Sequence, residues 1–211
     1  MATRTRLSRA DRMEQTLAVA HDLFAERGYG SVTMDEVAAA VGVTKPLLYN
    51  YFGNKERLYL ACLERAGDAL VATVVEAVAR AAEPGDALRH GLHAFFAFVE
   101  SDRATWKVLY DETLPAGGEI AARVGEYRTR ITDLVAASLL EQVPADRRDR
   151  ARVEVEALST ALLGAAESLA RWWLRTEAVS ASAAAELLIA TVEPGLRRTP
   201  PGPATRRTTT P

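Results

Sequence analysis

Apolar residues recur every three or four positions along most of the chain. Met13, Leu17, Ala20 and Phe24 show the spacing of an amphipathic helix, and the pattern returns in residues 88–99. No segment shows the sustained period-two alternation of a half-buried strand. The pattern predicts an all-α chain of about nine helices.

The segment 33–52 carries the signals of two short helices joined by a tight turn. Thr33 and Glu36 have the spacing of a capping box. Gly42 follows, where a left-handed residue ends a helix at little steric cost. Thr44 can cap the next helix, and Pro46 lies early enough that its missing N–H has no intrahelical partner to lose.

The second of these helices has two different faces. Leu48 and Phe52, four residues apart, form its buried side. The opposite side presents Lys45, Tyr49, Asn50 and Tyr51. Together with the helix that ends near Gly28, this predicts a three-helix helix-turn-helix unit over about residues 8–52. The alternative is an ordinary helical hairpin whose polar residues are only solvated.

Residues 12–63 also resemble the N-terminal domain of TetR-family transcriptional regulators. The resemblance is clearest over Ala38-x-x-x-Gly42-Val43-Thr44 and Leu48-Tyr49-x-Tyr51-Phe52-x-Asn54-Lys55. It implies that the recognition helix faces DNA with Thr44, Lys45, Pro46, Leu47, Tyr49, Asn50 and Tyr51. It also implies phosphate contacts for Thr33 and Lys55. Leu47 departs from the small or hydroxylated residue common there, so it either touches a thymine methyl or packs.

The remainder of the chain predicts a second, larger helical domain. Asn54 can cap a long helix from Lys55 to about Ala82, which Pro84 and the following glycine end. We therefore expect a DNA-binding domain over 1–54, an effector-binding and dimerisation domain over 55–195, and a disordered basic tail over 196–211.

Two helices near the C-terminus predict a dimer interface. Residues 152–175 are apolar or small on nearly every face, which indicates burial on two sides, and a shorter apolar helix follows. Two such helices per chain would form a four-helix interface about a two-fold axis, as the TetR resemblance also implies. The expected interface residues are Leu162, Leu163, Ala166, Trp173, Leu188 and Val192. The alternative is a core within one chain.

Aromatic residues of the second domain are candidates for an effector pocket. Aromatics at helical spacing are commonly plain core, yet helical domains of this size can hold a pocket, and members of the TetR family usually bind a small effector there. The expected lining residues are Phe95, Phe96, Trp106, Tyr110, Tyr127 and Trp172.

Charge is distributed unevenly along the 211 residues. The net charge is −2, yet residues 61–195 carry 14 basic and 21 acidic side chains, whereas 196–211 carry four basic and none acidic. The N-terminal arm with Arg4 and Arg6 can follow phosphates or a minor groove, or merely aid solubility. No apolar run is long enough to span a membrane, and the N-terminus lacks a secretory signal. We expect a cytoplasmic protein.

The sequence gives little support for an enzymatic or a metal-binding site. His90 and His93 are three residues apart without a third ligand, and the single cysteine, Cys62, is expected to be core rather than a redox sensor. No phosphate loop, nucleophile elbow or zinc-spaced cluster occurs, so neither a cofactor nor a metal is expected.

These features predict a homodimeric, ligand-responsive DNA-binding regulator, most simply a repressor released from a palindromic operator by an apolar or aromatic effector. Two rivals remain: a helical enzyme or small-molecule carrier with a vestigial helix-turn-helix, and an adaptor that holds protein through it.

Overall fold

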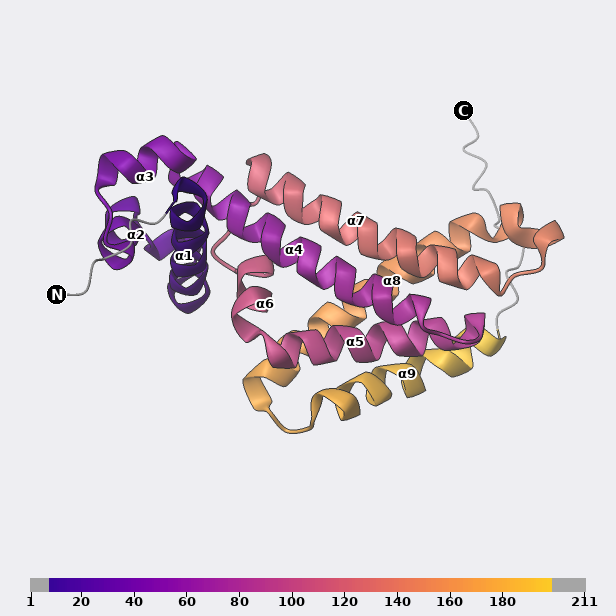
Figure 1. Ribbon diagram of the computed structural model, residues 1–211. Helices are drawn as coiled ribbons and strands as arrows, with labels where there is room; N and C mark the ends of the chain where they lie inside the picture. Colours follow the sequence, from indigo (N-terminus) through magenta and orange to yellow (C-terminus); the bar gives the residue numbers. More distant parts are fainter. Residues whose placement is uncertain (1–7, 199–211) are drawn as a thin grey trace, which may run out of the picture. The chain divides into compact units, whose positions relative to one another are not determined.

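The computed structural model describes residues 8–198, and this part of the chain is all-α (Figure 1). It contains nine α-helices, two short 3-10 helices and no strand, which confirms the predicted class. The α-helices are α1 (Arg9–Ser31), α2 (Met34–Val41), α3 (Lys45–Phe52), α4 (Lys55–Ala79), α5 (Ala87–Ser101), α6 (Arg103–Leu109), α7 (Gly118–Glu141), α8 (Arg148–Thr176) and α9 (Ala181–Arg198). The 3-10 helices are Pro84–Asp86 and Ala145–Arg147.

The chain forms two compact units that are not continuous in sequence. Of the described residues, the first unit comprises 8–69 and 102–126, and the second comprises 70–101 and 127–198. This division differs from the linear boundary expected at residue 54. The reason is that α6 packs against α1, so the chain returns to the first unit after α5.

Local signals fix the ends of α2, α3 and α4. Thr33 and Glu36 form both bonds of a capping box, and Gly42 takes the left-handed conformation (φ 76°, ψ 35°). Asn54 accepts a hydrogen bond from the N–H of Arg57 at 2.8 Å. Thr44 is the N-cap of α3, but its side chain makes no capping hydrogen bond.

The first unit has its core where α1 to α4 meet. Phe24, Val37 and Leu48 are almost completely buried, one from each of α1, α2 and α3. Tyr59 of α4 meets Phe24 edge to face at 4.8 Å between ring centroids, and its hydroxyl donates to the carbonyl of Val108 at 2.6 Å.

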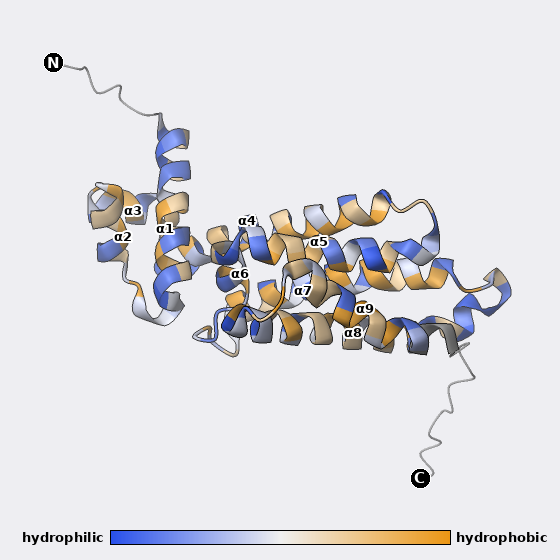
Figure 2. Cartoon of the chain, turned by 90° about the horizontal axis from the view of Figure 1, so that it is seen from below, coloured by the Kyte–Doolittle hydropathy of each residue, from blue (hydrophilic) through white to orange (hydrophobic). Residues whose placement is uncertain are grey.

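The second unit is a bundle of α5, α8, α9 and the latter parts of α4 and α7. Figure 1 shows α5 beside α9, and Phe96 of α5 meets Trp173 of α8 edge to face. Hydrophobic and hydrophilic residues alternate along these helices in Figure 2. Within the described residues, no helix combines the length and apolarity that crossing a membrane requires.

Helix α9 continues further than the sequence indicated. It runs through Pro194 to Arg198 and so includes residues 196–198 of the predicted tail. A proline removes one backbone donor but has a helical φ, so the chain can continue past it. Residues 199–211, like Arg4 and Arg6, lie outside the described residues.

Candidate nucleic-acid interface and apolar cleft

Helix α3 presents an exposed polar face above a buried apolar one. Leu48 and Phe52 are buried, whereas Lys45 and Asn50 are exposed and Tyr49 is 41% exposed. Thr44 and Pro46 are also exposed at the start of the helix, and Leu47 and Tyr51 are half-buried. The predicted sidedness of this helix is therefore present in the structure.

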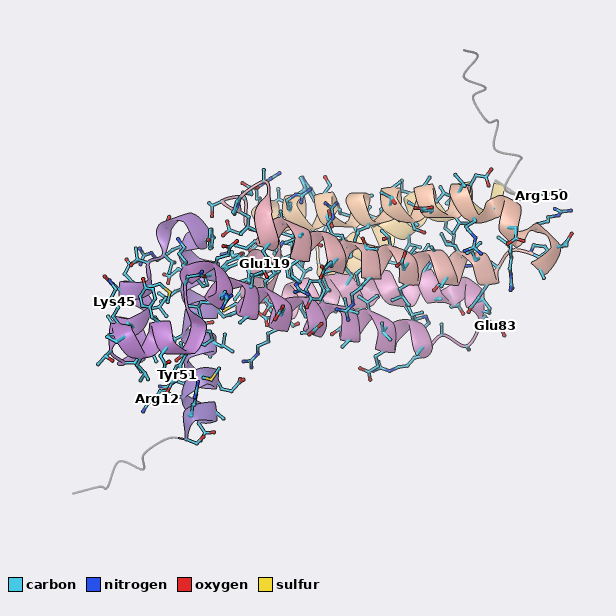
Figure 3. The ribbon with its side chains drawn as sticks, turned by 90° about the horizontal axis from the view of Figure 1, so that it is seen from above. Arg12, Lys45, Tyr51, Glu83, Glu119 and Arg150 are labelled. Atoms are coloured by element: carbon cyan, nitrogen blue, oxygen red, sulfur yellow. The ribbon has the colours of Figure 1, made fainter. Side chains whose placement is uncertain are left out.

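Lys45 is held by a carboxylate from the preceding helix. Its Nζ lies 2.7 Å from Oδ1 of Asp35, and Figure 3 shows Lys45 at the edge of the helix-turn-helix. The hydrogen bond to Asp35 raises the pKa of Lys45. The sequence did not reveal this pair, because an acidic residue in the first turn of a helix is already explained by the helix dipole.

Tyr51 is contacted by the first turn of α1. The guanidinium carbon of Arg9 lies 5.6 Å from the ring centroid, within the range of a cation–π contact. Figure 3 shows Tyr51 beside this part of α1, which also carries the labelled Arg12. A basic side chain at the end of the predicted N-terminal arm thus contacts α3.

The two predicted phosphate contacts lie at the starts of α2 and α4. Thr33 is exposed, and its hydroxyl donates to Oε2 of Glu36 at 2.8 Å. Lys55 is half-buried, with Nζ 4.4 Å from the ring centroid of Tyr29 and 3.4 Å from the carbonyl oxygen of Gly30. Burial lowers the pKa of Lys55.

The second unit contains an apolar cleft between α4, α5, α7 and α8. Its cavity volume is about 50 Å³, and the cleft is open to solvent on one side. Thirteen residues line it, and Ser138 is the sole polar side chain among them. The Ser138 hydroxyl already donates to the carbonyl of Leu134 at 3.0 Å, so the cleft offers a ligand an almost purely hydrophobic surface.

Most of the predicted pocket aromatics lie elsewhere. Phe95 lines the cleft, but Phe96 is in the core against Trp173. The others are distributed as follows: Trp106 and Tyr110 stack on each other in the first unit at 3.9 Å, Tyr127 is buried with Arg130 over its ring, and Trp172 is 38% exposed. The cleft is aliphatic because β-branched residues and leucines of four helices converge there.

The structure places the predicted dimer-interface residues inside the chain. Leu162, Leu163, Ala166, Trp173 and Leu188 are all buried, and Val192 is half-buried against an intramolecular apolar cluster. This corrects the expected surface, because these side chains form the inward stripes of α8 and α9. The outward side instead carries Leu158, Trp172 and Leu187, which are 39%, 38% and 52% exposed.

Cys62, His90 and His93 do not line the apolar cleft. Cys62 is buried, and burial raises the pKa of its thiol to about 12. His90 contacts the carbonyl oxygen of Asp86, whereas Nε2 of His93 contacts Glu186 at 2.8 Å. The described part of the chain holds no group of three or more potential metal ligands.

Family models match both parts of the chain. Residues 17–62 match the bacterial regulatory proteins of the tetR family, and residues 84–193 match the tetracyclin repressor-like C-terminal domain. The second match alone covers more than half of the 211 residues. The chain belongs to the TetR family.

The alignments with similar proteins cover most of this TetR-family chain. The HTH-type transcriptional activator FasR of Mycolicibacterium smegmatis is 33% identical over 172 residues, which cover 82% of this chain and 76% of FasR. A TetR-like transcriptional regulator from Rhodococcus sp. RHA1 has a solved structure with a TM-score of 0.75 and 32% identity, covering 92% of this chain and all of that one.

A further similar solved structure contains a small-molecule ligand as well as DNA. AibR in complex with isovaleryl coenzyme A and operator DNA has a TM-score of 0.69 and 23% identity, covering 85% of this chain and 97% of AibR. At this identity the likeness shows the fold alone. The TetR-family membership makes the chain a helix-turn-helix transcriptional regulator, with α2 and α3 as the helix-turn-helix.

Proposed function

We propose that the protein is a dimeric, effector-responsive regulator that reads operator DNA with α3. The observation that carries this proposal is that α3 exposes Lys45, Tyr49 and Asn50 while it buries Leu48 and Phe52. The capping box of α2 and the Asn54 cap of α4 fix the ends of the two helices that flank α3. Such a framework suits the major-groove docking of a recognition helix.

The side chains of α3 have complementary chemistry for a duplex. Lys45 can donate to a guanine edge or a phosphate, and Asn50 can pair with adenine through two hydrogen bonds. Thr33 and Lys55 are suited to phosphates and would fix the orientation of the unit. In a two-fold dimer, two α3 helices would read half-sites about 34–36 Å apart, or a multiple of that distance, so the operator should be roughly palindromic.

The apolar cleft of the second unit is suited to an effector with a hydrophobic portion. Its lining offers no unused polar group, so affinity would come from burying hydrocarbon at about 25 cal/mol per Å². An acyl chain has this chemistry, and the acyl-coenzyme A bound by AibR supports the class. The predicted aromatic character of the effector has less support, because Phe95 alone supplies a ring.

Effector binding would act on DNA affinity through a change in the position of α4. A coupling of about 1–3 kcal/mol would change operator affinity roughly five- to 150-fold. We expect the effector to release the protein from DNA. The repressor role stays a prediction, since the relative FasR is named an activator.

Dimerisation would use the outward faces of α8 and α9. Leu158 and Trp172 are separated by 14 residues, or nearly four turns, so they lie on one side of α8. Between them, a Cβ added at Gly164 would meet nothing within 4 Å in this chain. Small residues flanked by large apolar ones allow a second helix pair to approach closely, as in a four-helix interface.

Selection of bound duplexes from a random pool tests the DNA-binding proposal. We expect a palindromic consensus with half-sites about 10–10.5 base pairs apart, or a multiple of that. Lys45→Ala and Tyr49→Ala should weaken binding to it, whereas Lys107→Ala, which removes an exposed cation from α6, should not. Failure of the purified protein to bind DNA even at low salt concentration would exclude this function.

Titration of the operator complex with acyl-coenzyme A thioesters of increasing chain length tests the effector class. We expect release that strengthens with chain length until the cleft is filled. Ala166→Phe should abolish the response by filling the cleft, whereas Ala72→Phe adds the same ring at an exposed position of α4 and should keep it. Operator affinity that no thioester alters would contradict an acyl effector.

A further inference from the structure

Helix α1 is broken one turn before its end. Gly28 has φ 78° and ψ 157°, so the short turn Tyr29–Ser31 is set at an angle to the helix before it. At such a break, backbone N–H groups lose the carbonyl partners four residues earlier. The N–H groups of Tyr29 and Gly30 therefore need other acceptors.

A loop distant in sequence supplies those acceptors. Oδ2 of Asp111 accepts from the N–H of Tyr29 at 2.5 Å, and Oγ1 of Thr113 accepts from the N–H of Gly30 at 3.1 Å. The other oxygen of Asp111 accepts from the N–H of Thr113 at 2.7 Å, which fixes the shape of the loop. Asp111 and Thr113 thus cap the broken helix in the way an N-cap residue does, but from the segment between α6 and α7.

Close packing makes this arrangement specific to Gly28. A Cβ at this position would lie 3.0 Å from Oγ1 of Thr113 and 3.4 Å from Oδ1 of Asp111. Its positive φ also disfavours any other residue. The break in α1 and the docking of the loop are therefore one structural feature.

The capped turn carries residues that orient the candidate DNA contacts. The ring of Tyr29 lies under Nζ of Lys55, and the carbonyl of Gly30 accepts from the same ammonium group. The adjacent Arg27 donates to the carbonyl of Ser31 and to Oε1 of Glu36, the carboxylate that caps α2 with Thr33. Both expected phosphate contacts, Thr33 and Lys55, are thus attached to this turn.

We propose that Asp111 and Thr113 are positioning residues for DNA binding, because they cap the turn Tyr29–Ser31 and thereby hold Lys55 and Thr33 against the phosphates. The proposal rests on the proposed function of the helix-turn-helix. It places a determinant of operator affinity outside residues 17–62, in the segment that leads into α7. Helix α7 in turn contributes Ile131 and Val135 to the apolar cleft.

Two matched pairs of variants test this role on the full-length protein and its selected operator. Asp111→Asn and Glu112→Gln remove the same charge from neighbouring positions, and Glu112 is exposed. Thr113→Val removes the acceptor at nearly constant shape, whereas Thr113→Ser keeps a hydroxyl. Operator affinity is measured over a range of salt, and hydrogen exchange reports the amides of Tyr29 and Gly30.

We expect Asp111→Asn and Thr113→Val to speed exchange at these two amides and to weaken operator binding roughly three- to tenfold near 0.15 M salt. The slope of log affinity against log salt should decrease by about 0.9 for each phosphate that the variant no longer neutralises. The double variant Lys55→Ala with Asp111→Asn should lose less binding free energy for the operator than the sum of the losses of the two single variants. Glu112→Gln and Thr113→Ser should resemble the wild type.

Unchanged exchange at Tyr29 and Gly30 in both variants would show that the loop does not cap the turn. Faster exchange with wild-type affinity and salt slope would show capping without positioning. Either result overturns the proposal while the proposed function stands. Wild-type protein that selects no operator refutes the proposed function itself, and the positioning role with it.

Discussion

At the scale of single residues, a side chain at the start of α3 depends on a neighbouring helix for its orientation. Lys45 is exposed, yet its ammonium group is held by Asp35 of α2. An exposed ion pair contributes little to stability, so its value here lies in where it directs the cation. A carboxylate beside the proposed DNA face would also repel phosphates that approach without base-specific contacts.

Asp35→Asn should therefore raise affinity for random-sequence DNA and lower the ratio of operator to random-sequence affinity. Removing the negative charge favours phosphates, while Lys45 loses the acceptor that orients it. Glu26→Gln removes the same charge at an exposed position of α1 and serves as the control. Competition binding measures the ratio, and a ratio equal to that of the wild type would contradict this role for Asp35.

Cys62 should be unreactive in the folded protein. Its thiol is buried and its pKa is raised to about 12, so almost no thiolate exists near neutral pH. We expect a thiol reagent at pH 8 to label Cys62 only after denaturation. Stoichiometric labelling of the native protein within minutes would contradict this prediction.

At the scale of elements, helix ends fix the position of the proposed DNA face. The capping box of α2 favours the ionised form of Glu36. The hydrogen bond from the Thr33 side chain has the largest effect and that from Arg27 the next, and they lower the pKa of the Glu36 carboxyl to about 2. The same carboxylate joins α2 to the turn at the end of α1. The titration of Glu36 therefore reports on the junction of α1 and α2.

Acid should weaken this junction in a defined range. Because folding lowers the pKa of Glu36 from 4.5 to about 2, the stabilisation is fully present above pH 4.5 and disappears as the pH falls towards 2. Glu36→Gln should therefore lower the melting temperature at pH 7, and its difference from the wild type should shrink between pH 4.5 and 2. A difference that is constant over this range would show that the ionised carboxylate is not the stabilising group.

At the scale of the whole molecule, function would require two copies. One recognition helix reads one half-site, and a palindrome needs a two-fold axis. The outward face of α8 and α9 supplies apolar residues that a single chain leaves exposed, among them Leu158, Trp172 and Leu187. Burial of these residues against a second copy would supply part of the roughly 1,200–2,000 Å² typical of a stable interface.

Leu158→Arg combined with Trp172→Arg should shift the protein from dimer to monomer, because two charges would be buried without partners. Sedimentation measures the assembly, and operator affinity should fall strongly because a monomer reads a single half-site. Val75→Arg, at a 44% exposed apolar position of α4, is the control and should stay dimeric. A dimeric double variant would exclude this face as the interface.

Much of the candidate DNA-binding face could be predicted from the sequence because its determinants are local. The capping box, the left-handed Gly42 and the pair Leu48 and Phe52 involve residues at most four positions apart. Such signals depend on backbone geometry and short hydrogen bonds, which are the same in any fold. The sequence by itself therefore determined the helices and the sidedness of α3.

Tertiary structure decided the features that depend on long-range packing. Apolar or small residues occur on nearly every side of α8, so periodicity could not distinguish its inward Leu162 from its outward Leu158. The sequence alone is equally compatible with Trp106 as a pocket residue or a core residue. Only the tertiary structure shows that the segment containing Trp106 belongs to the first unit. Asp111 carries no local signal of its contact with Tyr29, because its partner lies 82 residues away. Only the folded chain, by bringing remote segments together, assigns these residues their surroundings.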